Sequence, residues 1–153
     1  MMKRSVTLLV GKKILLVLLS VSSMLLADIS KSSADIVTDH ATGLQWQDDY
    51  SDNGGTIKST NWKDAIKYCN ELPLDGGGWR LPNKDELLSI VNYAKSNPAI
   101  SDTFQYTISN AYWTSSPYAN TTSYAWNVNF CYGHSCSNAK SVNYYVRCVR
   151  SEQ

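Results

Sequence analysis

The chain has 153 residues and is close to neutral, with 14 Lys and Arg against 13 Asp and Glu. Beyond residue 13 the basic residues are dispersed, which argues against nucleic-acid binding because that needs clustered Lys and Arg to neutralise phosphates. All four cysteines and all ten tyrosines lie after residue 27, so the sequence divides into a short first segment and a remainder sized for one domain.

The first 27 residues have the pattern of a secretory signal peptide. Four basic residues, the last of them Lys13, precede an apolar run at 14–19, and we expect cleavage after Ala27. The run is short for a membrane span, which needs about 20 residues, and a retained N-terminal anchor is the alternative. Cleavage leaves 126 residues with ten basic and 13 acidic side chains, a net charge of −3. The sequence therefore predicts a periplasmic or secreted protein with no integral membrane segment after cleavage.

A linker at 28–35 is expected to lead into one α+β domain over residues 36–150. Residues 36–38 and 44–46 predict two extended pieces around a turn. The acidic stretch 48–55 departs from a calcium-binding EF-hand loop, because Tyr50 stands where the second acid is needed. We therefore expect a solvated acidic loop there, and no metal site.

Two helices are expected next, near 61–72 and 84–95. Asn61 is suited to cap the first helix, whose apolar residues recur at three and four positions to form one stripe. Asn83 followed by Glu86 has the arrangement of a capping box for the second helix, and the Asn97–Pro98 pair ends it.

The remainder is rich in aromatic and β-branched residues and predicts strands at 112–116, 124–131 and 143–150. In the middle strand one face is apolar, because the large residues alternate with small or polar ones. The residues of that apolar face are Tyr124, Trp126, Val128 and Phe130.

Four cysteines in a small exported domain predict two disulfides. Cys69 lies on the apolar stripe of the first helix and Cys148 on an inward face of the last strand. This placement favours a Cys69–Cys148 bond, with Cys131–Cys136 as a local clip, while the other two pairings are also open. Metal binding is the rival explanation, although the spacings contain no CxxC pair and the chain has only two histidines.

Five short phrases stand in fixed order along the chain: Thr42–Trp46 (TGLQW), Trp62–Ala65 (WKDA), Gly78–Pro82 (GWRLP, followed by DEL at 85–87), Tyr112–Ser116 (YWTSS) and Tyr145–Arg150 (YVRCVR). Together they resemble the Lcl C-terminal domain family, a bacterial extracytoplasmic domain named after the tail of a collagen-like adhesin. The resemblance covers nearly all of the chain after residue 35. It implies a C-type lectin-like fold, with two helices packed on a small twisted antiparallel sheet, long loops, and a last strand near the first.

The lectin chemistry of that broad fold does not transfer to this sequence. The calcium-dependent sugar site needs a Trp-Asn-Asp triplet, but here Trp126 and Asn127 are followed by Val128, and the proline triplet is absent. Serine and histidine occur at Ser116 and His134, but their co-occurrence does not make a triad. We therefore expect no catalytic residue and no cofactor.

Arginines inside the family phrases, at Arg80, Arg147 and Arg150, are expected to bind backbone carbonyls or acidic partners such as Glu86. A binding surface is expected instead in the stretch 103–125, where tyrosines mix with short polar residues as they do in recognition loops. The candidate ligand-binding residues are Tyr106, Tyr118, Asn120, Thr122 and Tyr124.

These patterns lead to one functional hypothesis and two alternatives. The hypothesis is an exported, adhesin-like, non-catalytic binding module that recognises a carbohydrate or a cell-envelope protein. The first alternative is a modifying enzyme of the formylglycine-generating type, which shares the broad fold and depends on redox-active cysteines. The second is a structural subunit of an envelope assembly.

Overall fold

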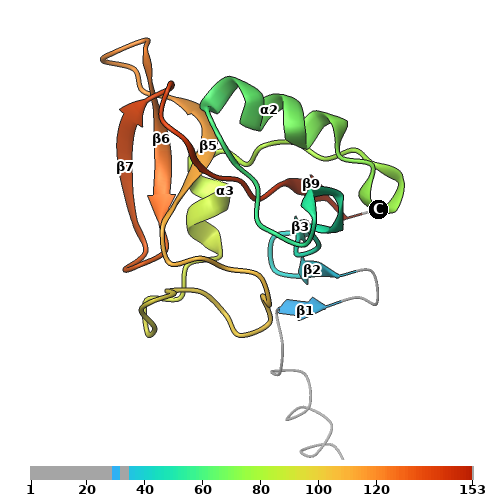
Figure 1. Ribbon diagram of the computed structural model, residues 1–153. Coiled ribbons are helices and arrows are strands. Elements are labelled where there is room, and N and C mark those ends of the chain that lie inside the picture. The colour runs from blue at the N-terminus through green and yellow to red at the C-terminus, as the bar shows by residue number, and fades with distance from the viewer. Residues whose placement is uncertain (1–28, 32–34, 153) are drawn as a thin grey trace, which may run out of the picture.

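The computed structural model describes residues 29–31 and 35–152, which form an α+β architecture of two helices and two sheets (Figure 1). The expected signal peptide lies outside the described residues, as does part of the expected linker. No helix in the described part of the chain is long and apolar enough to cross a membrane.

The first sheet has four antiparallel strands in the order β1-β2-β3-β9. They are β1 (Ile29–Lys31), β2 (Ile36–Asp39), β3 (Leu44–Gln47) and β9 (Val149–Ser151). The carboxylate of Asp39 accepts hydrogen bonds from the next residues of the β2–β3 turn, and Gly43 closes that turn at φ +66°. The expected proximity of the last strand to the first pieces is confirmed, since β9 pairs with β3.

The second sheet has five strands in the order β4-β8-β5-β6-β7. They are β4 (Ser59–Thr60), β8 (Tyr144–Tyr145), β5 (Ala111–Pro117), β6 (Tyr124–Asn129) and β7 (His134–Ala139). Neighbours are antiparallel except β5 and β8, which share one parallel bridge at Tyr112 and Tyr145. The single final strand expected at 143–150 was wrong: this segment is divided into β8 and β9, which belong to different sheets.

The first helix, α2 (Trp62–Glu71), begins where the sequence predicts. The Asn61 side chain accepts the Asp64 amide at 3.1 Å as the N-cap. The second helix, α3 (Lys84–Ser89), has the expected capping box but ends six residues early. The chain leaves the helix because Val91 forms an antiparallel bridge with Ile100. Beside this bridge, the Asn92 main-chain amide donates a hydrogen bond to the Ala99 carbonyl at 3.0 Å.

Two buried clusters meet at β5. Tyr112 packs in one cluster with Leu87 of α3, whereas the next residue, Trp113, packs in the other with Ala65 and Cys69 of α2. Neighbouring side chains of a strand point to opposite faces. The two helices therefore contribute to cores on the two faces of this strand.

The Cys69–Cys148 disulfide is present as expected, with a Cα–Cα distance of 5.4 Å and both residues fully buried. It joins α2 to the segment just before β9. Because it closes a loop of 79 residues, the chain-entropy model assigns it about 4.5 kcal/mol of stabilisation.

The expected Cys131–Cys136 clip is wrong, because both thiols are free. β6 and β7 stay paired from Tyr124 and Ala139 as far as Asn129 and His134, so Cys136 lies within the ladder. Cys131 lies beyond it in the turn, where its thiol donates to the Ser109 carbonyl at 2.9 Å. The hairpin is therefore held by pairing of β6 with β7 and not by the expected disulfide.

Candidate functional site

Four of the five candidate residues lie together on the hairpin between β5 and β6. Tyr118, Asn120, Thr122 and Tyr124 belong to its tip, which projects at the top of Figure 1 in orange. The Tyr118 amide donates to the Tyr124 carbonyl at 3.0 Å, and the Asn120 side-chain amide donates to the Tyr118 hydroxyl at 3.3 Å. The tip is thus held by its own hydrogen bonds.

A partly exposed tryptophan joins these residues from β6. The Tyr118 ring stands edge-on to Trp126 with a centroid distance of 5.2 Å. The Lys84 ammonium lies 4.8 Å from the Trp126 ring centroid, within range of a cation–π contact. We define the hairpin surface as Tyr118, Asn120, Tyr124, Trp126 and Lys84.

The start of α3 holds Lys84 at this surface. The Lys84 amide donates to the Ser116 hydroxyl at 3.0 Å, and the Ser115 amide donates to the Pro82 carbonyl at 2.7 Å. Burial of this face of β6 decreases toward the hairpin tip: Val128 is fully buried, whereas Tyr124 is 37% exposed. The apolar face expected for β6 is therefore buried in the core at its Val128 end and exposed at its Tyr124 end.

A second lysine–tryptophan pair flanks the same hairpin. The Lys140 ammonium lies 4.2 Å from the Trp62 ring centroid and donates to the Thr122 carbonyl at 2.8 Å. The Trp62 indole donates to the Thr114 carbonyl at 2.8 Å, which fixes the ring against β5. Thr122 therefore contributes its main chain to this pair.

Tyr106, the fifth candidate, does not belong to the hairpin. Its ring lies edge-on to Tyr50 at 5.9 Å, and its amide donates to the Asp48 carboxylate at 3.1 Å. The segment around 106 lies at the bottom of Figure 1 in gold, away from the orange hairpin. Its contacts serve a structural network.

That network is centred on a fully buried ion pair between Asp48 and Arg147, at 3.3 Å. Asp48 also accepts the Lys31 ammonium at 2.9 Å and the Gln105 amide at 2.8 Å. Asp48 was expected in a solvated loop, and that expectation is wrong for this residue. The groups that surround the Asp48 carboxylate come from segments that are far apart in sequence.

Arg147 is used structurally, as the sequence predicts for the family arginines. Its guanidinium donates to the Gln47 carbonyl at 3.0 Å and lies 4.4 Å from the Phe104 ring centroid. The other two arginines behave similarly. Arg80 forms two hydrogen bonds to Glu86, at 2.7 and 2.6 Å, and Arg150 donates to the Asp75 and Gly77 carbonyls.

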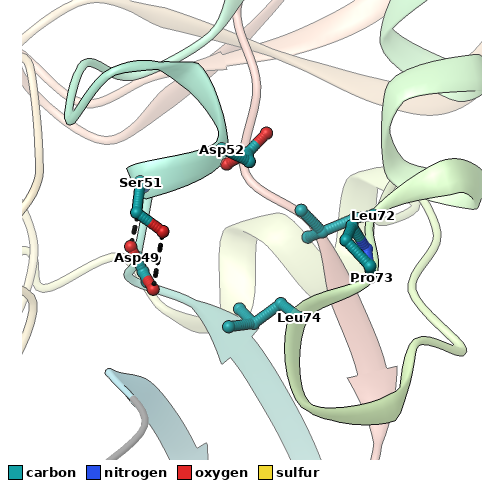
Figure 2. Close-up of a pocket in the computed structure, with 6 residues that line it drawn as sticks. All are labelled: Asp49, Ser51, Asp52, Leu72, Pro73 and Leu74. Atoms are coloured by element: carbon teal, nitrogen blue, oxygen red, sulfur yellow. Dashed lines mark hydrogen bonds between the residues drawn. The ribbon is translucent and has the colours of Figure 1, made fainter.

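A small pocket of about 120 Å³ opens beside the acidic stretch (Figure 2). Its apolar wall is formed by Leu72, Pro73 and Leu74, which face the side chains of Asp49, Ser51 and Asp52. The Asp49 carboxylate accepts the Ser51 amide at 2.7 Å, and Asp52 accepts the Tyr68 hydroxyl at 3.2 Å. Burial raises the pKa of Tyr68, which keeps this donor protonated. Both carboxylates are therefore engaged in local bonds.

Across residues 29–31 and 35–152, no three His, Cys, Asp or Glu side chains are placed to hold a metal ion. A more polar hollow of about 330 Å³ lies along 95–107.

Ser116 and His134 lie near opposite ends of β6, because Pro117 pairs with Ala125 whereas His134 pairs with Asn129. They do not form a nucleophile–base pair.

Sequence reasoning missed the lysine–tryptophan pairs of this site: Trp62, Lys84, Trp126 and Lys140. Trp126 carries a usable signal, because it lies two residues after Tyr124 and shares its strand face. The lysines carry none, since each reaches its ring from a segment far away in sequence.

The fold and the hairpin surface define a small disulfide-linked α+β domain whose most prominent candidate site is an aromatic surface hairpin. The family model of the Lcl C-terminal domain matches residues 35–150. The chain belongs to this family, as the five sequence phrases indicate. No curated protein matches the chain.

Proposed function

We propose that the chain is an exported, non-catalytic binding module that recognises a carbohydrate or a cell-envelope partner through its hairpin surface. The proposal includes a C-type lectin-like arrangement of the fold and removal of a signal peptide after Ala27. Membership of the Lcl C-terminal domain family supports it, because the resemblance to that family implies an extracytoplasmic domain.

The observation that carries the proposal is the partly exposed Trp126 ring with polar groups around it. A sugar ring offers an apolar C–H face and a rim of hydroxyls. An aromatic ring suits the face, while the Asn120 amide and the Tyr118 hydroxyl suit the rim. The tip is held by internal bonds, so little conformational entropy is lost on binding.

The test is glycan-array binding of the purified protein with and without a chelator. We expect binding that is insensitive to the chelator and lost when Tyr118 and Tyr124 are both changed to Ala. Tyr93→Ala is the matched control, because Tyr93 is 73% exposed but its ring lies beside Gly133 in the β6–β7 turn, away from the tip. Unchanged glycan binding by the double variant would refute the proposed site.

One observation favours the enzymatic alternative, which is the presence of two free thiols at Cys131 and Cys136. Enzymes of the formylglycine-generating type depend on redox-active cysteines. Neither thiol lines the two pockets described above. Alkylation under native conditions distinguishes the functions, because a reactive thiol whose blocking abolishes an oxidase activity would support the enzyme and exclude the binding module.

A further inference from the structure

We propose that the free edge of β7 is a homodimer interface, in which two copies pair their β7 strands antiparallel about a twofold axis at Cys136. The five-stranded sheet of each copy would continue into that of the other. The inference is independent of the proposed ligand.

The hydrogen bonds between β6 and β7 determine which main-chain groups of β7 point outward. The Lys140 amide donates to the Ser123 carbonyl at 2.9 Å, which extends the β6–β7 register by one hydrogen-bonded pair. Hydrogen-bonded pairs alternate along an antiparallel ladder. Cys136, opposite Asn127, therefore directs its main-chain groups toward β6, whereas those of Ser135 and Ser137 point away from it.

These outward groups have no partner within the described residues. No hydrogen bond reaches the main chain of Ser135 or Ser137 from outside the β6–β7 ladder in residues 29–31 and 35–152. β7 is the outermost strand of its sheet, and no ribbon lies beyond it in Figure 1. Unpaired amides and carbonyls on an edge are a template for another strand.

β7 lacks the features by which edge strands avoid pairing. Its sequence, His134–Ala139, contains no Lys, Arg, Asp, Glu or proline, and the ladder to β6 runs through six pairs without a bulge. The other sheet edges differ. β4 has two residues, β1 has three and carries Lys31, and β9 has three and carries Arg150. Short or charged edges resist strand addition.

The β7 edge fits a second copy of this chain. With the axis at Cys136, Ser135 of each copy faces Ser137 of the other. Each such pair exchanges two main-chain hydrogen bonds, so the outward amides and carbonyls of Ser135 and Ser137 are all used in each copy. The facing side chains are Ser, Cys and Asn with His134, so none is too bulky for close approach. Recognition of a foreign strand usually relies on side-chain pockets, and neither pocket described above touches β7.

The pairing would have a consequence for binding. Trp126 lies opposite Ser137 in the ladder and shares its sheet face. A twofold axis perpendicular to the sheet keeps the same face of both copies on one side. The two hairpin surfaces would then point the same way, which favours simultaneous binding to a repeating ligand.

The test measures the oligomeric state of the protein expressed from the full chain, by sedimentation equilibrium over a wide concentration range. We expect a concentration-dependent dimer. Ser137→Pro removes an outward amide without breaking a bond to β6, so it should raise the dimer dissociation constant at least tenfold. Ser137→Ala, which keeps the amide, is the matched control, and melting curves verify that both variants are folded.

Thiol crosslinking tests the register separately. In this register the two Cys136 residues face each other as a non-hydrogen-bonded pair, about 4.5 Å apart between Cα atoms. Copper(II) phenanthroline would take two electrons from the two thiols, with loss of two protons, and leave a disulfide-linked dimer. Cys136→Ala should abolish the crosslink, while Cys131→Ala should retain it.

A dimer that weakens in Ser137→Pro and crosslinks through Cys136 supports the proposal. A protein that is monomeric at all concentrations overturns it. So does a dimer that is unaffected by Ser137→Pro, or one that does not crosslink through Cys136.

Discussion

Replacing Arg147 with Met tests whether the buried ion pair organises the domain. The Asp48 and Arg147 side chains are both fully buried, and the guanidinium also donates to main-chain carbonyls. Met fills much of the same volume but removes every donor. The substitution therefore leaves the buried carboxylate of Asp48 without one of its two cationic partners.

Breaking a buried pair from one side costs about 3–5 kcal/mol. Asp48 would keep the Lys31 ammonium and the amides of Gln105 and Tyr106, so the lower end of the range applies. A loss of about 3 kcal/mol is a large share of the 5–15 kcal/mol typical of a domain. It corresponds to a fall in melting temperature of roughly 10 °C.

Urea denaturation followed by tryptophan fluorescence measures this loss. Arg80→Met is the control, since the Arg80 side chain is 43% exposed and its pair with Glu86 should contribute at most about 1 kcal/mol. Adding Asp48→Asn to Arg147→Met should recover part of the stability, because the buried carboxylate charge is then gone. A loss below about 1 kcal/mol for Arg147→Met would refute the reasoning.

Three further predictions follow from the fold. Changing Cys69 and Cys148 together to Ala should lower the free energy of unfolding by up to about 4.5 kcal/mol, as measured by urea denaturation; a change below about 1 kcal/mol would contradict the loop-closure argument. The hydrogen bond from Arg80 lowers the pKa of Glu86. The ionised Glu86 therefore stabilises the fold above the unfolded pKa of about 4.3, and this contribution is lost as the pH falls through the lower folded pKa. Glu86→Gln should flatten the pH dependence of stability in that window, and an unchanged acid profile would argue against it. Asn61→Ala should cost about 1 kcal/mol through loss of the α2 cap, and thermal denaturation beside Asn61→Ser, which keeps a capping oxygen, would show whether the cap is responsible.

The parts of the fold that the sequence predicts are those set by near neighbours. The caps at Asn61 and Asn83 are confirmed because each needs a residue only three positions away. The Cys69–Cys148 bond is also confirmed, because both cysteines lie on apolar faces whose periodicity is local. The same reasoning predicts strands at 112–116 and 124–131, which correspond to β5 and β6.

The parts that it does not predict depend on distant partners. β7 is built from small polar residues with little strand propensity, and it forms because β6 offers a complete ladder. The local sequence predicts that Asp48 is a loop residue, because its partner Arg147 lies 99 positions away. At the candidate site, the tyrosines of the hairpin are visible in the sequence, whereas the two lysines are not.

The Cys69–Cys148 bond has a further consequence for resistance to proteolysis. The hairpin tip at 118–123 lies between the two cysteines in sequence, so a protease that cuts the tip leaves both pieces joined by the disulfide. The pieces would also stay paired through the β3–β9 ladder and the two cores. A nicked molecule should therefore migrate as one species on a non-reducing gel and as two after reduction. The segment proposed as the contact surface is thus one that a protease can cut without separating the two pieces.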